Sequence, residues 1–97
     1  MSEDTILHRE MGCTRAEFLA WLPGAVNGAQ FDVDGDSIRV RYQAGEVLIR
    51  IAQTADRKLG LMLLPVLRVS IEFSDLDGAA RKSFLGRFDL FTRRGGG

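Results

Sequence analysis

Cys13 and His8 are the residues of this sequence that could form a nucleophilic dyad, because an imidazole can activate a nearby thiol. The chain contains one cysteine and one histidine. A helix is predicted to begin just after Cys13, and a thiol at a helix start can have a lowered pKa. No third catalytic group or glycine-rich oxyanion loop accompanies the pair, and a lone cysteine is most often a small buried side chain. A thiol enzyme using Cys13 is therefore the weaker alternative, and the sequence leans against an enzyme.

The acidic segment 32–36 (DVDGD) offers alternating carboxylates of the kind that bind calcium. A helix–loop–helix calcium loop starting at Asp32 would need a glycine at its sixth position and a glutamate at its twelfth. This chain has Ser37 and Gln43 at those positions. The dipeptide Asp34-Gly35 is instead typical of a tight hairpin turn. One cysteine and one histidine cannot form a usual zinc site either, so we expect neither a metal nor a cofactor.

The C-terminal segment 93–97 (RRGGG) shares its glycine ending with ubiquitin-like and sulfur-carrier proteins. In those proteins the tail follows the last strand of a β-grasp domain, whereas here a helix is predicted before the glycines. We therefore interpret residues 95–97 as a helix cap that continues into a flexible tail. Residues 1–97 as a whole are predicted to form one domain, long enough to bury a core without disulfides.

Alternation of apolar and polar residues predicts the strands that would position these side chains. The candidate strands are residues 5–11, 30–33, 38–43, 47–52 and 67–73. The polar segment 53–58 is predicted to be the longest loop. One face of the strands is apolar and is expected to turn toward the helices. Its residues are Ile38, Val40, Tyr42, Val47, Ile49, Ile51, Leu67, Val69, Ile71 and Phe73.

Two helices are predicted from their caps and apolar stripes. Thr14 and Glu17 form a capping box at the start of the first helix. Residues 74–77 are expected to cap the second helix and to place acidic residues in its first turn, where the helix dipole favours them. Pro23 disfavours the helical conformation at Leu22, so we expect the first helix to kink or stop there.

The predicted order of elements is strand, helix, three or four strands, helix. Because each strand alternates and each helix has one apolar stripe, this order gives an α+β fold. An antiparallel sheet of four to five strands would carry both helices on one face. The arrangement is similar to that of TATA-binding-protein-like and related helix-on-sheet folds. This resemblance concerns topology alone and implies no particular activity.

Strand alternation also brings four arginines together on the sheet face opposite the helices. They are Arg39, Arg41, Arg50 and Arg68. Continuing the last strand backward across Pro65 adds three apolar side chains to that face, and the neighbouring strand adds Leu48. The three apolar residues are Met62, Leu64 and Val66.

This face has two interpretations. As a binding surface, apolar at one end and cationic at the other, it would suit an anionic amphipath, a partner protein or a second copy of the chain. As a solvated face, its arginines would pair with Glu46 and Glu72, while a bulge at Pro65 would turn Met62 and Leu64 inward. The first interpretation is our hypothesis for function.

Thirteen acidic residues balance thirteen basic ones, so no overall field favours nucleic acid or an anionic membrane. The chain has no apolar stretch of membrane length and an acidic start, so we expect a soluble, cytoplasmic protein. The leading hypothesis is a small binding or protein-interaction domain whose occupant is a protein partner or a second copy. The alternative is an acidic or amphipathic small ligand, bound in a cavity between the helices and the sheet.

Overall fold

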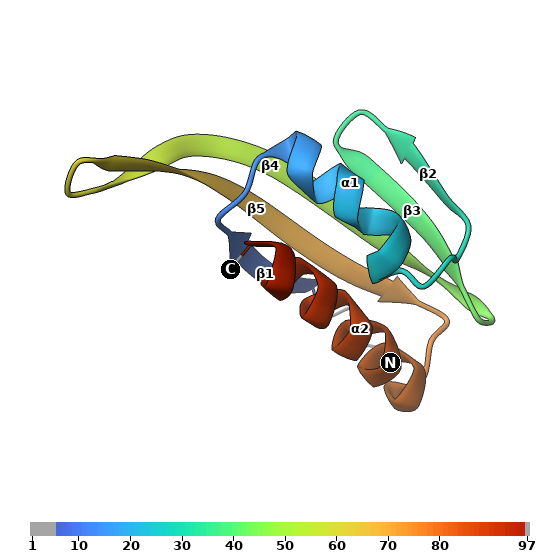
Figure 1. The fold of residues 1–97 in the computed structure, drawn as a ribbon. Coiled ribbons are helices and arrows are strands. Elements are labelled where there is room, and N and C mark those ends of the chain that lie inside the picture. The colour runs from blue at the N-terminus through green and yellow to red at the C-terminus, as the bar shows by residue number, and fades with distance from the viewer. Residues whose placement is uncertain (1–5, 97) are drawn as a thin grey trace.

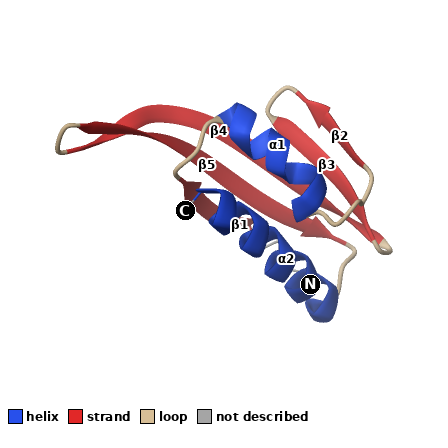
Figure 2. Cartoon of the chain, in the orientation of Figure 1, coloured by secondary structure: helices blue, strands red, loops and turns tan. Residues whose placement is uncertain are grey.

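Five antiparallel strands form one open sheet, and two helices pack against one of its faces (Figures 1 and 2). The computed structural model describes residues 6–96 of the chain, with side chains through residue 92. In chain order the elements are β1 (Ile6–Met11), α1 (Arg15–Ala25), β2 (Phe31–Asp34), β3 (Ser37–Tyr42), β4 (Gly45–Leu59), β5 (Met62–Ser74) and α2 (Gly78–Gly96). Strands neighbour one another in the order β1-β5-β4-β3-β2. The predicted α+β fold is confirmed, with five strands in the described part of the chain.

The register of the strands turns one apolar face of the sheet toward the helices. Ile38 lies opposite Ile49, which lies opposite Ile71, so branched side chains form a continuous row across three strands. The ten strand residues predicted for this face all lie on it. Nine of them are buried, and Tyr42 is half-buried. The predicted inner face of the sheet is therefore confirmed.

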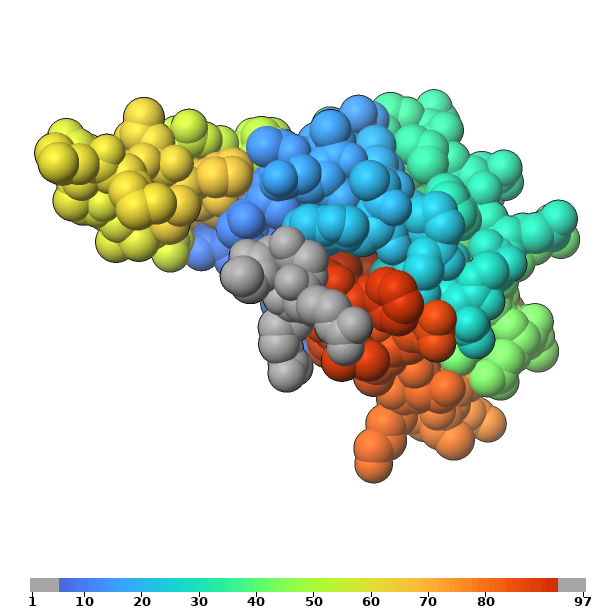
Figure 3. All heavy atoms as spheres, in the orientation of Figure 1, coloured from blue at the N-terminus to red at the C-terminus, as the bar shows by residue number. Residues whose placement is uncertain are grey.

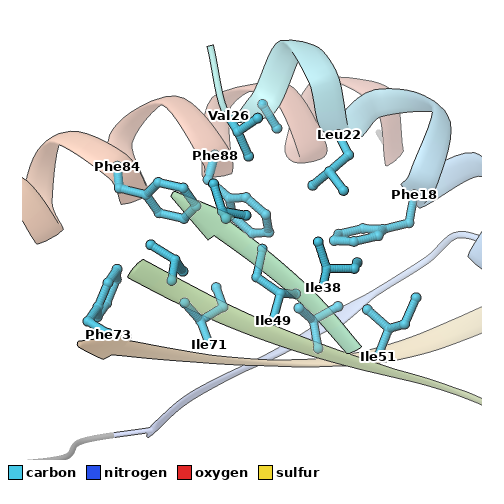
Figure 4. Close-up of a cluster of buried hydrophobic side chains, with 14 of the residues drawn as sticks. Phe18, Leu22, Val26, Ile38, Ile49, Ile51, Ile71, Phe73, Phe84 and Phe88 are labelled. Atoms are coloured by element: carbon cyan, nitrogen blue, oxygen red, sulfur yellow. The ribbon is translucent and has the colours of Figure 1, made fainter. Parts of the chain in front are cut away.

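The core lies between the helices and the sheet, and its largest side chains are phenylalanines (Figure 4). The Phe88 ring of α2 stacks on Phe84 with 5.7 Å between centroids, and it meets Phe18 of α1 edge-on at 6.0 Å. Phe84 in turn contacts the rings of Tyr42 and Phe73 edge-on. Aromatic pairs in these geometries are favourable beyond their burial, so this cluster ties both helices to the sheet.

Helix α1 starts at the predicted capping box. The Thr14 Oγ1 accepts a 3.1 Å hydrogen bond from the Glu17 backbone N–H, and the Glu17 Oε1 accepts a 2.9 Å bond from the Thr14 N–H. The expectation that Pro23 stops the helix at Leu22 is wrong, because α1 continues to Ala25. Proline removes one backbone hydrogen bond, and this close to the helix end few further bonds remain for it to disrupt.

Strand β4 runs through residues 53–58, so the loop predicted there is wrong. The Gln53 amide shows the reason. Its Nε2 donates to the carbonyl oxygens of Cys13 at 3.2 Å and Val66 at 3.0 Å, while its Oε1 accepts from the Arg15 N–H at 2.7 Å. A polar side chain thus satisfies three backbone groups, two at the start of α1 and one in β5, and anchors the strand. The polar composition that suggested a loop belongs to a strand exposed to solvent.

Beyond the body of the sheet, β4 and β5 continue as a two-stranded hairpin that we call the arm (residues 54–66). Strand β1 pairs with β5 only from Leu67 onward, and the arm projects past both helices (Figures 1 and 3). The molecule therefore extends 46 Å in one direction, against 27 and 24 Å in the others. A register shift between Thr54 and Arg57 marks a bulge in β4 opposite Pro65, which is a position where sheets accept a proline.

Helix α2 begins at Gly78, directly after the segment 74–77 that was predicted to cap it. Asp77 caps the helix, since its Oδ1 accepts a 2.8 Å hydrogen bond from the Ala80 N–H. Asp75 has a left-handed backbone conformation with φ of 58° and lies in the turn before the helix. The expected acidic first turn is therefore wrong. A single acidic cap takes its place, where a carboxylate satisfies a free backbone N–H.

Helix α2 ends at Gly96, so it includes Gly95 and Gly96 of the predicted tail. Gly97 lies outside the described residues. The flexibility of residues 95–97 therefore stays a prediction. Across residues 6–96, neither helix is long and apolar enough to cross a membrane.

Candidate binding face

The sheet face turned away from the helices, which we call the open face, carries mostly polar and charged side chains. Each strand contributes alternate residues to it, and the register arranges them in rows from β1 to β2. One row contains His8, Ser70, Arg50, Ser37 and Asp34, and the next contains Ile6, Glu72, Leu48, Arg39 and Asp32. Basic and acidic residues are therefore both present in these rows, with small polar or apolar residues among them.

Four arginines cross the open face as a diagonal line, which we call the arginine stripe (Arg41, Arg39, Arg50 and Arg68). Arg41 and Arg39 follow one another on the open side of β3. Arg50 in β4 is diagonal to Arg39, and Arg68 in β5 is diagonal to Arg50. Diagonal neighbours in a sheet are about 7–8 Å apart, so the stripe is roughly 20 Å long.

Two arginines of the stripe have ion-pair partners. The Arg39 Nε lies 3.8 Å from the Glu46 Oε1, and the Arg68 Nε lies 3.8 Å from the Glu10 Oε2. Both pairs are long and exposed, so they add little to stability. The partner expected for the solvated face is thus present for Arg39, whereas Arg68 pairs with Glu10 in place of Glu72.

The other two arginines of the stripe, Arg41 and Arg50, have no ion pair among the side chains of residues 6–92. Both are exposed. Beside Arg50 the face is hollowed over about 470 Å³. Ala52 lines this hollow, and its methyl group leaves room between the long side chains of Arg50 and Arg68. The hollow therefore gives an anionic group access to the Arg50 guanidinium, beside the Glu10–Arg68 ion pair that lines the same hollow.

His8 and Ser70 also line this hollow. The sequence analysis assigned neither Ala52 nor Ser70 to a site, and it considered His8 only as the partner of Cys13. Alternation in β1 sets His8 on the face away from Leu7. Its neighbours depend on the pairing of β1 with β5, which sets His8 opposite Ser70. No local sequence signal indicates that pairing, because the two strands are distant in the chain.

The structure divides the four apolar residues predicted for the open face. Leu48 is half-buried within the body of the sheet, whereas Met62, Leu64 and Val66 lie in the arm. Met62 is exposed, Leu64 is half-buried and Val66 is buried. The bulge lies in β4, so β5 keeps its alternation past Pro65 and Met62 is not turned inward. The role of these residues in binding stays a prediction.

Cys13 lies in the core, with none of its surface exposed. Burial raises the pKa of its thiol, and the nearby Glu17 carboxylate raises it further. The lowered pKa considered for a cysteine at a helix start is therefore wrong. His8 faces the other side of the sheet, so the two residues do not form a dyad. This geometry gives no support to a thiol enzyme.

We expect Cys13 of the native protein to react with a thiol reagent such as DTNB at least about a hundredfold more slowly than an exposed thiol, because reaction requires opening of the core. The absorbance of the released product measures the rate. Cys13→Ala combined with Ala79→Cys places one thiol at an exposed position of α2 and serves as the control. Native labelling of Cys13 at the control rate would contradict the buried position and would favour a reactive thiol.

The acidic segment 32–36 forms the end of β2 and the turn into β3. The Asp36 Oδ1 accepts a 2.9 Å hydrogen bond from the Arg15 Nε, and the Gly35 carbonyl accepts one from the same guanidinium at 2.6 Å. These contacts fix the predicted hairpin turn against α1. Among residues 6–96, no three His, Cys, Asp or Glu side chains are grouped as a metal site would need.

The fold and the open face together define a small α+β domain with an exposed, mixed-charge sheet surface. Comparison with models of known families, with curated proteins and with solved structures finds no match for this chain. Any function of the domain is therefore inferred from its own residues.

Proposed function

We propose that this chain is a small non-enzymatic interaction domain that binds an acidic segment of a partner protein along the arginine stripe. The stripe is the observation that carries the proposal, since it sets four exposed guanidinium groups in one line on an open sheet face. Arginine forms two-pronged, charge-assisted hydrogen bonds with carboxylates. A line of guanidinium groups therefore suits a chain segment with several acidic side chains.

Carboxylates beside the stripe favour a protein partner over a nucleic acid. Asp32 and Asp34 of β2 line a second hollow of about 250 Å³ together with Arg39, and Glu46 lies next to Arg41 in the register. These carboxylates would repel a phosphate backbone, whereas a protein segment can offer basic side chains to them. The chain also carries no net charge, unlike the strongly basic domains typical of nucleic-acid binding.

A small acidic or amphipathic ligand between the helices and the sheet is the alternative function. The interior is filled around Phe88, whose ring lies 5.7 and 6.0 Å from two other phenylalanine rings, and this packing supports a surface site. Thermal shifts with acidic metabolites separate the two functions. A cavity ligand would raise the melting temperature equally at low and high salt, whereas binding at the stripe weakens as salt rises.

Charge reversal at Arg50 tests the proposed function. We expect Arg50→Glu to weaken binding of a fluorescein-labelled polyglutamate peptide about tenfold, because the change removes an attraction and adds a repulsion. The double change Arg39→Glu with Arg41→Glu is expected to abolish binding and leave the fold intact. Lys82→Glu makes the same charge change at an exposed position of α2 and is the matched control, which should bind as the wild type does. Fluorescence anisotropy measures the affinity.

Two results would overturn the proposal. Equal weakening by Arg50→Glu and Lys82→Glu would show that net charge governs binding, and unchanged binding by the double variant would show that the stripe is not the site. A single-stranded DNA of matched length serves as a further probe. Tighter binding of this DNA than of the peptide would assign the stripe to nucleic acid. Circular dichroism spectra establish that each variant is folded.

A further inference from the structure

The tip of the arm exposes a cluster of large apolar side chains. Leu61 is fully exposed, and Leu59, Met62 and Leu63 are 55%, 62% and 64% exposed. Together they leave roughly 500 Å² of apolar surface in contact with water, which is within the range for the largest patch on a monomer and is often functional. The arm projects from the body of the molecule (Figure 3), so this surface is accessible to another molecule.

The geometry of the hairpin spreads these side chains around the tip. Gly60 and Leu61 form the two-residue turn, with Gly60 at φ of 60° and Leu59 opposite Met62. By strand alternation, Met62 and Leu63 lie on opposite sides of the two-stranded ribbon. The helices cover one side of the sheet and end before the arm (Figure 1). Neither side of the ribbon is therefore covered by a helix at the tip.

A hollow of about 110 Å³ lies between the end of β1 and the arm. Its lining is partly apolar, with Met11, Leu64 and Val66, and partly charged, with Glu10 and Arg57. The Arg57 guanidinium donates a 2.6 Å hydrogen bond to the Glu10 Oε1 and so ties the arm to β1. The hollow is of the size of one aliphatic side chain, since cavities left by such side chains are on the order of 100 Å³.

We infer that the arm is a dimerisation element and that its partner is a second copy of this chain. Leu61 and Val66 are five residues apart, about 17 Å along a strand. Two arms lying side by side in opposite directions about a two-fold axis would therefore place Leu61 of each copy at the hollow beside Val66 of the other. Such an interface uses the same patch twice and closes on itself. This role is separate from the proposed binding at the arginine stripe.

The area and the sequence of the arm fit a reversible dimer. Two tips could together bury at most roughly 1,000 Å² of apolar surface, which is below the standard size of specific interfaces, so we expect a dissociation constant in the micromolar range or weaker. Pro65 lies on the part of β5 that β1 leaves uncovered. A proline at a free strand edge opposes the continued addition of strands. We therefore expect two arms to pack through their side chains as a closed dimer, and not to add strands edge to edge in an open-ended assembly.

The charges near the tip favour a second copy over a membrane surface. Insertion of an apolar tip into lipid is usually helped by a cluster of basic residues. Of the two cations beside this tip, Arg57 is already paired with Glu10 at 2.6 Å, which leaves Lys58. The hollow at the end of β1 is also of the size of one side chain. Binding to a lipid surface would not require such a hollow.

Sedimentation equilibrium of the full chain over a range of concentrations tests the inference. We expect the wild type to form a dimer, and Leu61→Asp to weaken association at least about a hundredfold, because the charge would have to enter an apolar contact. Leu61 is fully exposed, so this change should leave the monomer folded. Leu90→Asp changes another exposed leucine, on α2, and is the control that should associate as the wild type does.

A wild type that stays monomeric at all concentrations would overturn the inference, as would a Leu61→Asp variant that associates normally. Flotation with phosphatidylcholine and phosphatidylserine vesicles gives a further readout. Vesicle binding by a monomer that is lost in Leu61→Asp would assign the tip to a membrane and would also overturn it. The Arg50→Glu variant should dimerise normally, so failure of the arm proposal is distinguishable from failure of the proposed function.

Discussion

Phe88→Ala is expected to lower the free energy of unfolding by about 3–5 kcal/mol, among the largest effects of any single change in this chain. The Phe88 side chain is fully buried, and its ring contacts Phe84 on the same helix and Phe18 on α1. Removing it would leave a cavity where both helices meet the sheet (Figure 4). Urea unfolding followed by circular dichroism measures the loss.

Two further variants show whether the loss comes from the cavity. Phe88→Leu keeps most of the aliphatic volume and should lose less than Phe88→Ala. Leu90→Ala removes a side chain that is 51% exposed on the same helix, and it should change stability by less than about 0.5 kcal/mol. A loss below about 1 kcal/mol in Phe88→Ala would contradict the central position of this ring.

Gly45→Ala is expected to lower the free energy of unfolding by about 1–3 kcal/mol, because it forces a methyl group into space already occupied by backbone. A β-carbon at Gly45 would lie 2.6 Å from the Asp75 carbonyl oxygen and still closer to that of Ser74. Neither oxygen belongs to a flexible side chain, so the start of β4 or the end of β5 has to move. The midpoint of urea unfolding measures the change.

Gly86→Ala is the matched control for this prediction. Gly86 lies within α2, and a β-carbon there would have no neighbouring atom within 4 Å. Alanine is a better helix former than glycine, so this change should raise stability by up to about 1 kcal/mol. Similar effects of the two substitutions would show that the close approach at Gly45 is not what requires a glycine.

The two proposed interactions use separate parts of the molecule. The arginine stripe lies on the body of the sheet, whereas the apolar tip lies at the end of the arm. A dimer joined by its arms would present two stripes, so a partner protein with two acidic segments would bind more tightly than one with a single segment. A dimerisation variant such as Leu61→Asp should therefore weaken binding of a bivalent probe and leave binding of a monovalent one unchanged.

The sequence predicted the inner and outer faces of the sheet correctly, and this placed the arginines of the stripe on one surface. Arg39 and Arg68 alternate with apolar neighbours, and the period of two in a strand fixes which side each residue takes. The stripe itself could not be predicted, because Arg50 and Arg68 become diagonal neighbours only through the register of β4 against β5. Their binding role stays a prediction.

Two errors of the sequence interpretation have the same origin. Residues 53–58 were expected to form a loop because they are polar, but Gln53 uses its amide to bond to Cys13 and Val66. Pro23 was expected to kink or stop α1 at Leu22, but the helix continues to Ala25 and packs against α2, where Phe91 occupies the space that a side chain at Gly24 would need. Contacts between distant segments outweigh local preference in both places.

The sequence alone determined the elements of this protein that depend on near neighbours: the Thr14 capping box, the turn at Gly35 and the alternation of the strands. These features involve bonds or periods spanning a few residues, so the chain encodes them locally. The tertiary structure alone decided the strand order, the hollow between Arg50 and Arg68, and the extension of β4 and β5 into an exposed arm. Each of these depends on pairing between segments far apart in the chain, which the pattern of a single strand does not specify.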